Sequence, residues 1–156
     1  MPSVLALHRR LARNRFGTWL FSRLVCFKAP YFSTIAPRIT ALAPGRCVAT
    51  MRDRRRVHNH IGTVHAIALC NLAELSGGLM TDASIPASMR WIPKGMTVQY
   101  LKKAQGAMHA VATPEIAVVE ATEGYELPVN VDIRNAADEA VFHARILMWV
   151  APKSSR

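Results

Sequence analysis

The feature that most constrains the fold is the segment at residues 65–76, HAIALCNLAELS, which is apolar on nearly every side. A helix on a protein surface carries a wide polar face, and this segment has none. Such a helix is stable only when other parts of the protein enclose it on most sides. The sequence Ser-Gly-Gly at 76–78 predicts that the helix ends there.

Short segments with the composition of β-strands lie on both sides of the predicted helix. Two of them, at 38–43 and 47–57, are joined by the turn Ala-Pro-Gly-Arg and predict a hairpin. Four more follow the helix, at 96–101, 107–121, 125–135 and 139–150. In 125–135 apolar and polar residues alternate, which predicts a sheet with one buried face. Residues 80–95 contain two prolines and no periodicity, and they predict a long loop.

This order of elements predicts an α+β fold in which an antiparallel sheet wraps around one long central helix. The chain has 156 residues and 51% hydrophobic content, which suits a single domain, and we place it at 29–152. Three cysteines without close spacing argue against a disulfide framework or a zinc ribbon and fit a reducing cytoplasm. No stretch of about 20 apolar residues is present, so no transmembrane segment is expected.

Residues 1–28 predict a basic amphipathic helix that precedes this domain. The formal net charge is +10, and no acidic residue occurs before Asp53. Such a charge favours anionic partners, which include nucleic acid, a membrane surface, an acidic carrier protein and a phosphorylated cofactor. An Arg-rich start without acids is also typical of an organellar transit peptide, whereas aromatic residues suit a helix that packs on something. These aromatic residues are Phe16, Trp19, Phe21 and Phe27.

Three histidines before the central helix raise the question of a metal site. His58 and His60 share one face if the chain is extended there, and His65 follows five residues later. A metal would need a third or fourth ligand with fixed geometry, and no nearby residue repeats the spacing. We therefore predict no metal. His65 is better explained as a cap of the helix or as a hydrogen-bonded core residue.

The start of the helix offers different chemistry. The backbone N–H groups near His65, Ala66 and Ile67 have no acceptor within the helix and lie at its positive dipole end. They can stabilise the oxygen of a polarised carbonyl. Gly62 and the small Ala66 allow a ligand to approach closely, and Asn59 can hydrogen-bond in the same pocket.

One carboxylate, Glu74, lies eight residues beyond Ala66, which is about 12 Å along an α-helix. One chain cannot easily bring both groups to the same carbonyl carbon. A two-fold dimer with antiparallel helices would place Glu74 of one copy beside the Ala66 N–H of the other. The alternative is a structural carboxylate paired with an arginine of the basic N-terminal third, because a buried acid needs a partner or water.

The segment HNHIGTVHAIALCNLAEL resembles the signature of hotdog-fold thioesterases of the PaaI and 4-hydroxybenzoyl-CoA thioesterase type. The matching positions are Asn59, Gly62, Thr63, Val64, His65 and Glu74. The similarity extends more loosely over residues 30–150, and the element order deduced above is that of the hotdog fold. It implies a thioesterase for acyl-CoA or acyl-carrier protein that is a homodimer or a dimer of dimers. No cofactor is implied besides the CoA moiety of the substrate.

Within this resemblance Glu74 is implied to act as nucleophile or general base on the thioester. The Ala66 N–H is implied to form the oxyanion hole, and Asn59 to position the carbonyl or a water. Ala66 and Ile67 stand where the family usually has Gly-Gly, which keeps the backbone N–H but narrows the entrance. Gly78 stands where some relatives carry a hydroxyl residue.

A CoA ligand would bring phosphates to the mouth of this site, where basic residues can bind them. The candidates are Arg52, Arg54, Arg55, Arg56, Arg90, Lys94, Lys102 and Lys103, with Gly62 lining the same pocket. Any one of these side chains can instead be a solvated surface residue.

Three functions therefore stay open. The leading one is a cytoplasmic enzyme that hydrolyses acyl thioesters. The second is a non-catalytic protein that binds acyl-CoA or an acyl carrier, which the narrowed entrance favours. The third is a binder of membrane or nucleic-acid surfaces through residues 1–28, although the resemblance implies no nucleic-acid partner.

Overall fold

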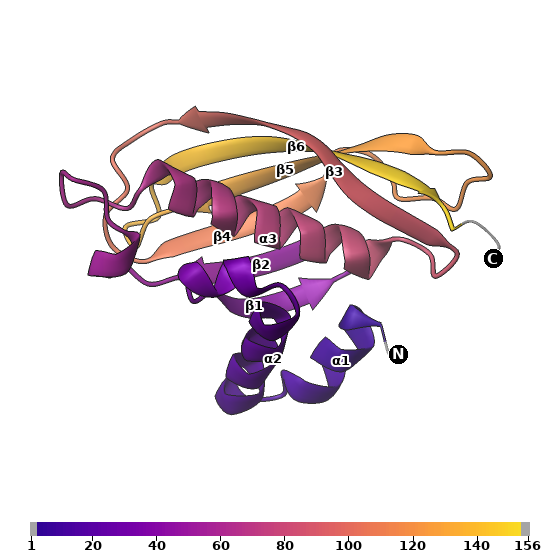
Figure 1. The fold of residues 1–156 in the computed structure, drawn as a ribbon, viewed down its shortest axis with the longest axis horizontal. Coiled ribbons are helices and arrows are strands. Elements are labelled where there is room, and N and C mark those ends of the chain that lie inside the picture. Colours follow the sequence, from indigo (N-terminus) through magenta and orange to yellow (C-terminus); the bar gives the residue numbers. More distant parts are fainter. Residues whose placement is uncertain (1–2, 154–156) are drawn as a thin grey trace.

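The structure, a computed structural model, describes residues 3–153, so the first two residues of the predicted N-terminal segment lie outside it. Six strands form one antiparallel sheet in the order β1-β2-β4-β5-β6-β3. The strands are β1 Arg38–Ala43, β2 Arg46–Met51, β3 Met89–Tyr100, β4 Met108–Pro114, β5 Tyr125–Arg134 and β6 Ala140–Pro152. The long helix α3, Ala66–Ser84, lies along one face of the sheet (Figure 1). The predicted α+β arrangement of a sheet around a long helix is confirmed.

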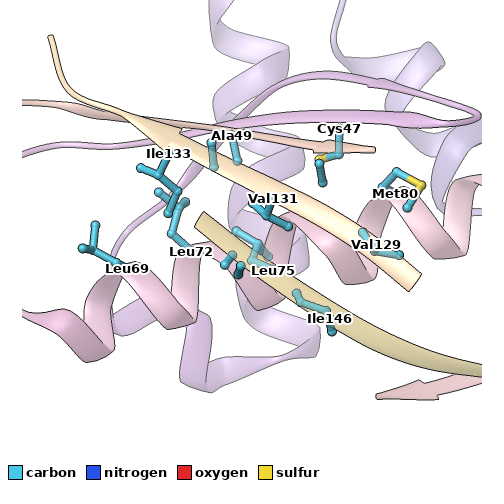
Figure 2. Packing of buried hydrophobic residues seen from close by; sticks show 14 of the residues in the cluster. Cys47, Ala49, Leu69, Leu72, Leu75, Met80, Val129, Val131, Ile133 and Ile146 are labelled. Carbon is cyan, nitrogen blue, oxygen red and sulfur yellow. The ribbon is translucent and has the colours of Figure 1, made fainter. Parts of the chain in front are cut away.

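The core lies between α3 and the sheet (Figure 2). Leu72 and Leu75 of α3 are buried against residues from strands that are far apart in the sequence. The strand residues labelled in the figure are Cys47 and Ala49 of β2, Val129, Val131 and Ile133 of β5, and Ile146 of β6. The apolar run of the sequence is thus enclosed as predicted, because the sheet removes its side chains from water.

α3 continues through Ser-Gly-Gly at 76–78, so the predicted stop is wrong. Both glycines are buried within the helix. A Cβ atom at Gly77 would lie 2.9 Å from Ile146 Cδ1, and one at Gly78 would lie 2.8 Å from Trp91 Cη2. The two glycines therefore allow β6 and β3 to approach the helix closely instead of ending it.

Residues 80–95 form the last turn of α3 and the start of β3, so the predicted loop is wrong. Ile85 precedes Pro86 and has an extended backbone, with ψ of 145°, which ends the helix. Pro93 lies within β3, where it is tolerated because β3 is an edge strand with an irregularity between Pro93 and Gly95. The other predicted strands are present, but two of them are shorter than predicted. The strand predicted at 47–57 is β2, which ends at Met51, and the strand predicted at 107–121 is β4, which ends at Pro114.

The N-terminal segment forms two helices instead of the single one predicted. These are α1 Val4–Leu11 and α2 Arg15–Lys28. The chain turns between them because Asn14 starts a new helix, and its Oδ1 accepts a hydrogen bond from the Gly17 N–H at 2.8 Å. None of the helices within residues 3–153 has the length and apolar composition that a membrane span requires.

α2 packs beside the edge strand β1 (Figure 1). Phe21 is fully buried, and the Ser22 hydroxyl accepts a hydrogen bond from the Ile39 N–H of β1 at 2.9 Å. A 3-10 helix, Pro30–Thr34, then leads into the sheet. The division of the chain into 1–28 and 29–152 stays a prediction.

We expect Gly17→Ala to destabilise the protein, although alanine is the better helix former by about 1 kcal/mol. A Cβ atom at Gly17 would lie 1.8 Å from the backbone oxygen of Leu11, so α1 has to move away from α2. Thermal unfolding followed by circular dichroism should show a lower Tm. Arg23→Ala, at an exposed position of α2, is the control, and an unchanged Tm for Gly17→Ala would contradict the packing of α1 on α2.

Candidate functional site

Asn59 builds the loop that leads into α3. Its Oδ1 accepts hydrogen bonds from the N–H groups of Ile61 and Thr63, both at 3.1 Å, and its Nδ2 donates to Thr63 Oγ1 at 2.9 Å. Gly62 has φ of +78°, a left-handed conformation that favours glycine. The side chain of Asn59 is thus engaged within its own loop, and its predicted role toward a carbonyl or a water stays a prediction.

His65 is the N-cap of α3, which is one of the two predicted explanations for this residue. Its Nδ1 accepts a hydrogen bond from the Ile67 N–H at 3.0 Å, so this ring nitrogen carries no proton. The Ala66 N–H takes part in no hydrogen bond among residues 3–153. It therefore lies at the positive end of the helix dipole with its donor free for a ligand.

A small pocket of about 190 Å³ adjoins the start of α3. Its lining includes Arg56, His65 and Asn71. Asn71 is 5% exposed, and its Nδ2 donates to Thr34 Oγ1 at 3.0 Å, while its Oδ1 has no partner within the described part of the chain. A buried acceptor without a partner is unfavourable, so the pocket suits a water or ligand group that donates a hydrogen bond.

Glu74 lies about two turns further along α3, and its side chain is exposed in a single chain. No ion pair among residues 3–153 includes it, so the predicted alternative of an arginine partner is not found there. Glu74 lies instead on the wall of a mainly apolar pocket of about 600 Å³, which Lys28 and Asp82 also line. A free carboxylate beside an apolar pocket is a candidate general base.

The N-terminal helices form part of this large pocket, which the sequence did not predict. Its apolar lining includes Val4 and Leu7 of α1, Leu24 and Val25 of α2, Leu79 of α3 and Trp91 of β3. The Trp91 Nε1 donates a hydrogen bond to Asp82 Oδ1 at 3.3 Å, which holds the ring over α3. The size and lining of the pocket suit an apolar ligand such as an acyl chain. Of the aromatic residues that the sequence analysis names in this segment, Phe21 lines the pocket.

Glu74 and the Ala66 N–H lie about 12 Å apart along the axis of α3. One chain therefore does not bring the two groups to a single carbonyl. Ile67, which follows Ala66, is 55% exposed and lies seven residues before Glu74, a spacing that places two residues on the same face of a helix. The side chains of Ile67 and Glu74 thus belong to one open face of α3, and the free Ala66 N–H lies at the start of the same helix.

Two of the three histidines near the start of α3, His58 and His65, line the small pocket there. His58 Nε2 hydrogen-bonds to Asp53 Oδ1, and Asp53 Oδ2 accepts a hydrogen bond from the Gly106 N–H at 2.7 Å. These contacts tie the loop before α3 to the segment after β3. His60 is exposed. Among the residues that the structure describes, no group of three His, Cys, Asp or Glu side chains is placed to hold a metal ion.

Some of the basic candidates gather near the start of α3. The arginines at 52 and 54–56 are exposed in the loop that leads to it. Lys103 lies near this loop, because the carbonyl of the adjacent Ala104 accepts a hydrogen bond from the Val64 N–H at 2.9 Å. These side chains form a positive surface beside the free Ala66 N–H.

The other basic candidates lie elsewhere. The Lys94 ammonium lies 4.8 Å from the centre of the Trp149 ring, and Lys102 Nζ forms an ion pair with Glu139 Oε1 at 2.8 Å. Arg90 is exposed on β3. None of the three lines either pocket, and their predicted part in binding CoA stays a prediction.

Residues 17–150 match the model of a family described as Domain of unknown function (DUF4442). The chain belongs to this family. A crystal structure from a genomics programme is 46% identical to it, with a TM-score of 0.81 over 94% of this chain and 96% of that chain. A comparison with curated protein sequences finds no match.

Two further crystal structures share the fold of this chain at lower sequence identity. A thioesterase from Haemophilus influenzae is 20% identical, with a TM-score of 0.73 over 86% of this chain and 91% of that chain. A protein from Pseudomonas aeruginosa, described as a probable thioesterase, is 23% identical, with a TM-score of 0.75 over 93% and 96%. The predicted hotdog fold is confirmed.

The hydrogen bond with His58, together with that from the Gly106 N–H, holds the pKa of Asp53 below its usual value. A carboxyl group with a lowered pKa stabilises the fold above its unfolded pKa of about 4, and this contribution is lost as the pH falls. We expect Asp53→Asn to lower the free energy of unfolding at pH 7 by about 1 kcal/mol or less, because the pair is partly exposed. Urea unfolding at pH 7 and pH 3 measures this, and an equal loss at both would contradict the assignment.

Proposed function

We propose that this protein hydrolyses acyl thioesters at a site shared by two copies of the chain. The observation that carries the proposal is Glu74, which forms no ion pair among residues 3–153, beside an apolar pocket of about 600 Å³ and on the same helix as the free Ala66 N–H. A carboxylate can activate water, and an unpaired N–H at a helix start can hold a carbonyl oxygen. The fold shared with two proteins named as thioesterases supports this reaction.

A second copy is required because one helix holds the two groups about 12 Å apart. β3 is an edge strand of 12 residues, and it exposes Ile92, Met96 and Tyr100 by 59%, 38% and 51%. An exposed edge with apolar side chains favours pairing with another strand. Pairing of two β3 strands about a two-fold axis would run the two α3 helices antiparallel and set Glu74 of one copy beside Ala66 of the other.

In the proposed reaction Glu74 accepts a proton from a water molecule, which attacks the thioester carbon. The carbonyl oxygen becomes an oxyanion, and the Ala66 N–H of the other copy stabilises it at the positive end of α3. Collapse of this intermediate breaks the carbon–sulfur bond, and the departing thiolate takes the proton that Glu74 holds. The products are a carboxylic acid and a thiol, and the balance requires no cofactor.

The surroundings of the two groups fit the two parts of an acyl-CoA or acyl-carrier-protein thioester. The apolar pocket beside Glu74 would hold the acyl chain. The arginines at 52 and 54–56, with Lys103, would meet the phosphates of CoA or the acidic surface of a carrier protein. The substrate would then contact both copies, just as the two catalytic groups come from different copies.

We expect Glu74→Gln to lower kcat/KM for acyl-CoA substrates by about 10²–10⁴-fold, because the variant lacks the general base. Its stability should change little, since the side chain is exposed. Release of free thiol from a panel of acyl-CoAs measures the rate. Glu123→Gln makes the same chemical change at an exposed position before β5 and should leave the rate unchanged.

If the Glu74→Gln variant hydrolyses acyl-CoA at the wild-type rate, Glu74 is not the general base. Tight binding of acyl-CoA in calorimetry without turnover by the wild type would instead favour a non-catalytic acyl-CoA or acyl-carrier binding protein. The exposed Ile67 side chain, where glycine is usual in the resembling thioesterases, is the feature that favours this second candidate.

A further inference from the structure

α2 exposes an apolar face on the side that does not pack against the sheet. Phe16, Trp19 and Phe27 are 68%, 47% and 88% exposed, and Leu24 is 41% exposed. Phe16 and Phe27 lie at helical spacing, with Trp19 on one side of them and Leu24 on the other, while the charged Arg23 lies among them and the buried Phe21 lies outside this face. A contiguous patch of exposed aromatic and aliphatic side chains marks a surface that contacts a partner.

Basic side chains surround this apolar face. The helices α1 and α2 and the turn between them carry exposed Arg9, Arg10, Arg13, Arg15, Arg23 and Lys28. None of these six forms an ion pair within residues 3–153, and the first acidic residue of the chain is Asp53. The surface of the two helices is therefore both apolar and strongly positive.

We propose that the outer face of α2 docks on an anionic phospholipid bilayer. A helix that lies in the plane of the bilayer surface buries its apolar side chains at the level of the headgroups, and its Arg and Lys side chains reach the lipid phosphates. Trp and Tyr favour this zone because their rings are apolar with a polar tip. Tyr31, which lies just after α2 and is 65% exposed, adds another exposed aromatic ring beside this face.

Charge argues against the other possible occupants of this face. A second copy of the chain would bring the same cations together with no acid from these helices to pair with them. A nucleic acid would satisfy the cations, but proteins that stack bases on aromatic rings hold the strand in a groove. Here Phe27 and Leu24 lie on the exposed side of a helix. An anionic bilayer can pair its phosphates with the cations and can also bury the exposed apolar side chains.

Docking in this way brings the large apolar pocket to the surface of the bilayer. Leu24, Val25 and Lys28 of α2 also line the pocket that contains Glu74. A ligand with an acyl chain would then enter the pocket from the lipid phase. Docking requires no catalysis by Glu74, so vesicle binding and thioester hydrolysis are tested separately.

Flotation of the full-length protein with phosphatidylcholine vesicles, with and without about 30% phosphatidylglycerol, tests the proposal. We expect binding to the anionic vesicles and at least about tenfold weaker binding to the neutral ones. Phe16→Ser combined with Phe27→Ser should weaken binding to the anionic vesicles at least about tenfold. Ile116→Ser combined with Val119→Ser changes two exposed apolar residues between β4 and β5 and should bind like the wild type.

A charge variant, Arg13→Gln with Arg23→Gln, should weaken binding in the same direction and keeps the proposal testable if the aromatic variant is unstable. Circular dichroism shows whether each variant is folded. The proposal is overturned if the wild type binds neither kind of vesicle or binds both equally. It is also overturned if the aromatic variant binds vesicles normally while its oligomeric state in size-exclusion chromatography falls, because the face then contacts another copy.

Discussion

The enclosure of α3 by the antiparallel sheet determines the rest of the structure. Leu72 and Leu75 are buried between the helix and the strands, and Gly77 and Gly78 let β6 and β3 come into contact with it. Because the sheet covers most of its circumference, one face of the helix stays open, and that face carries Glu74. The free Ala66 N–H and the free carboxylate are therefore displayed on one rigid element at a fixed spacing.

The two ends of this open face have different surroundings. At the start of α3, beside the loop fixed by Asn59 and Gly62, lie a small pocket lined in part by Arg56, His65 and Asn71 and a group of exposed arginines. Further along, α1, α2 and Trp91 contribute apolar side chains to the large pocket that Glu74 also lines. α1 precedes residues 17–150, which match the family model. One part of the pocket wall therefore lies outside the matched region. A thioester has the same polarity, with an apolar acyl group at one end and a charged carrier at the other.

Much of the fold could be predicted because it depends on local patterns. The apolar run predicts an enclosed helix, and alternation in 125–135 predicts a strand with one buried face. The errors arise where a contact between residues far apart in the sequence determines the local structure. Gly77 and Gly78 suggest a helix stop locally, but the ring of Trp91 and the side chain of Ile146 occupy the space of their Cβ atoms. Pro93 suggests a loop locally, but an unpaired sheet edge tolerates it.

Part of the geometry around the candidate site could be predicted for the same reason. The spacing of Ala66 and Glu74 follows from helix geometry, and the cap formed by His65 follows from its place before the helix. The inward hydrogen bonds of Asn59 and the pocket wall formed by α1 and α2 depend on how the chain packs, and no residue pattern within the segment 57–78 indicates them.

Mixing two inactive variants tests most directly whether one site takes Glu74 from one copy and the N–H of Ala66 from another. Ala66→Pro removes this N–H and keeps the helix start, because proline is favoured at the first helical position and His65 already has an extended backbone, with ψ of 139°. In a hybrid of Glu74→Gln and Ala66→Pro chains, one of the two sites has both groups. We expect each variant alone to be nearly inactive and an equal mixture, denatured and refolded together, to recover about a quarter of the wild-type thioester hydrolysis. No recovery, with hybrid dimers detected by mass spectrometry, would contradict a site shared between two copies.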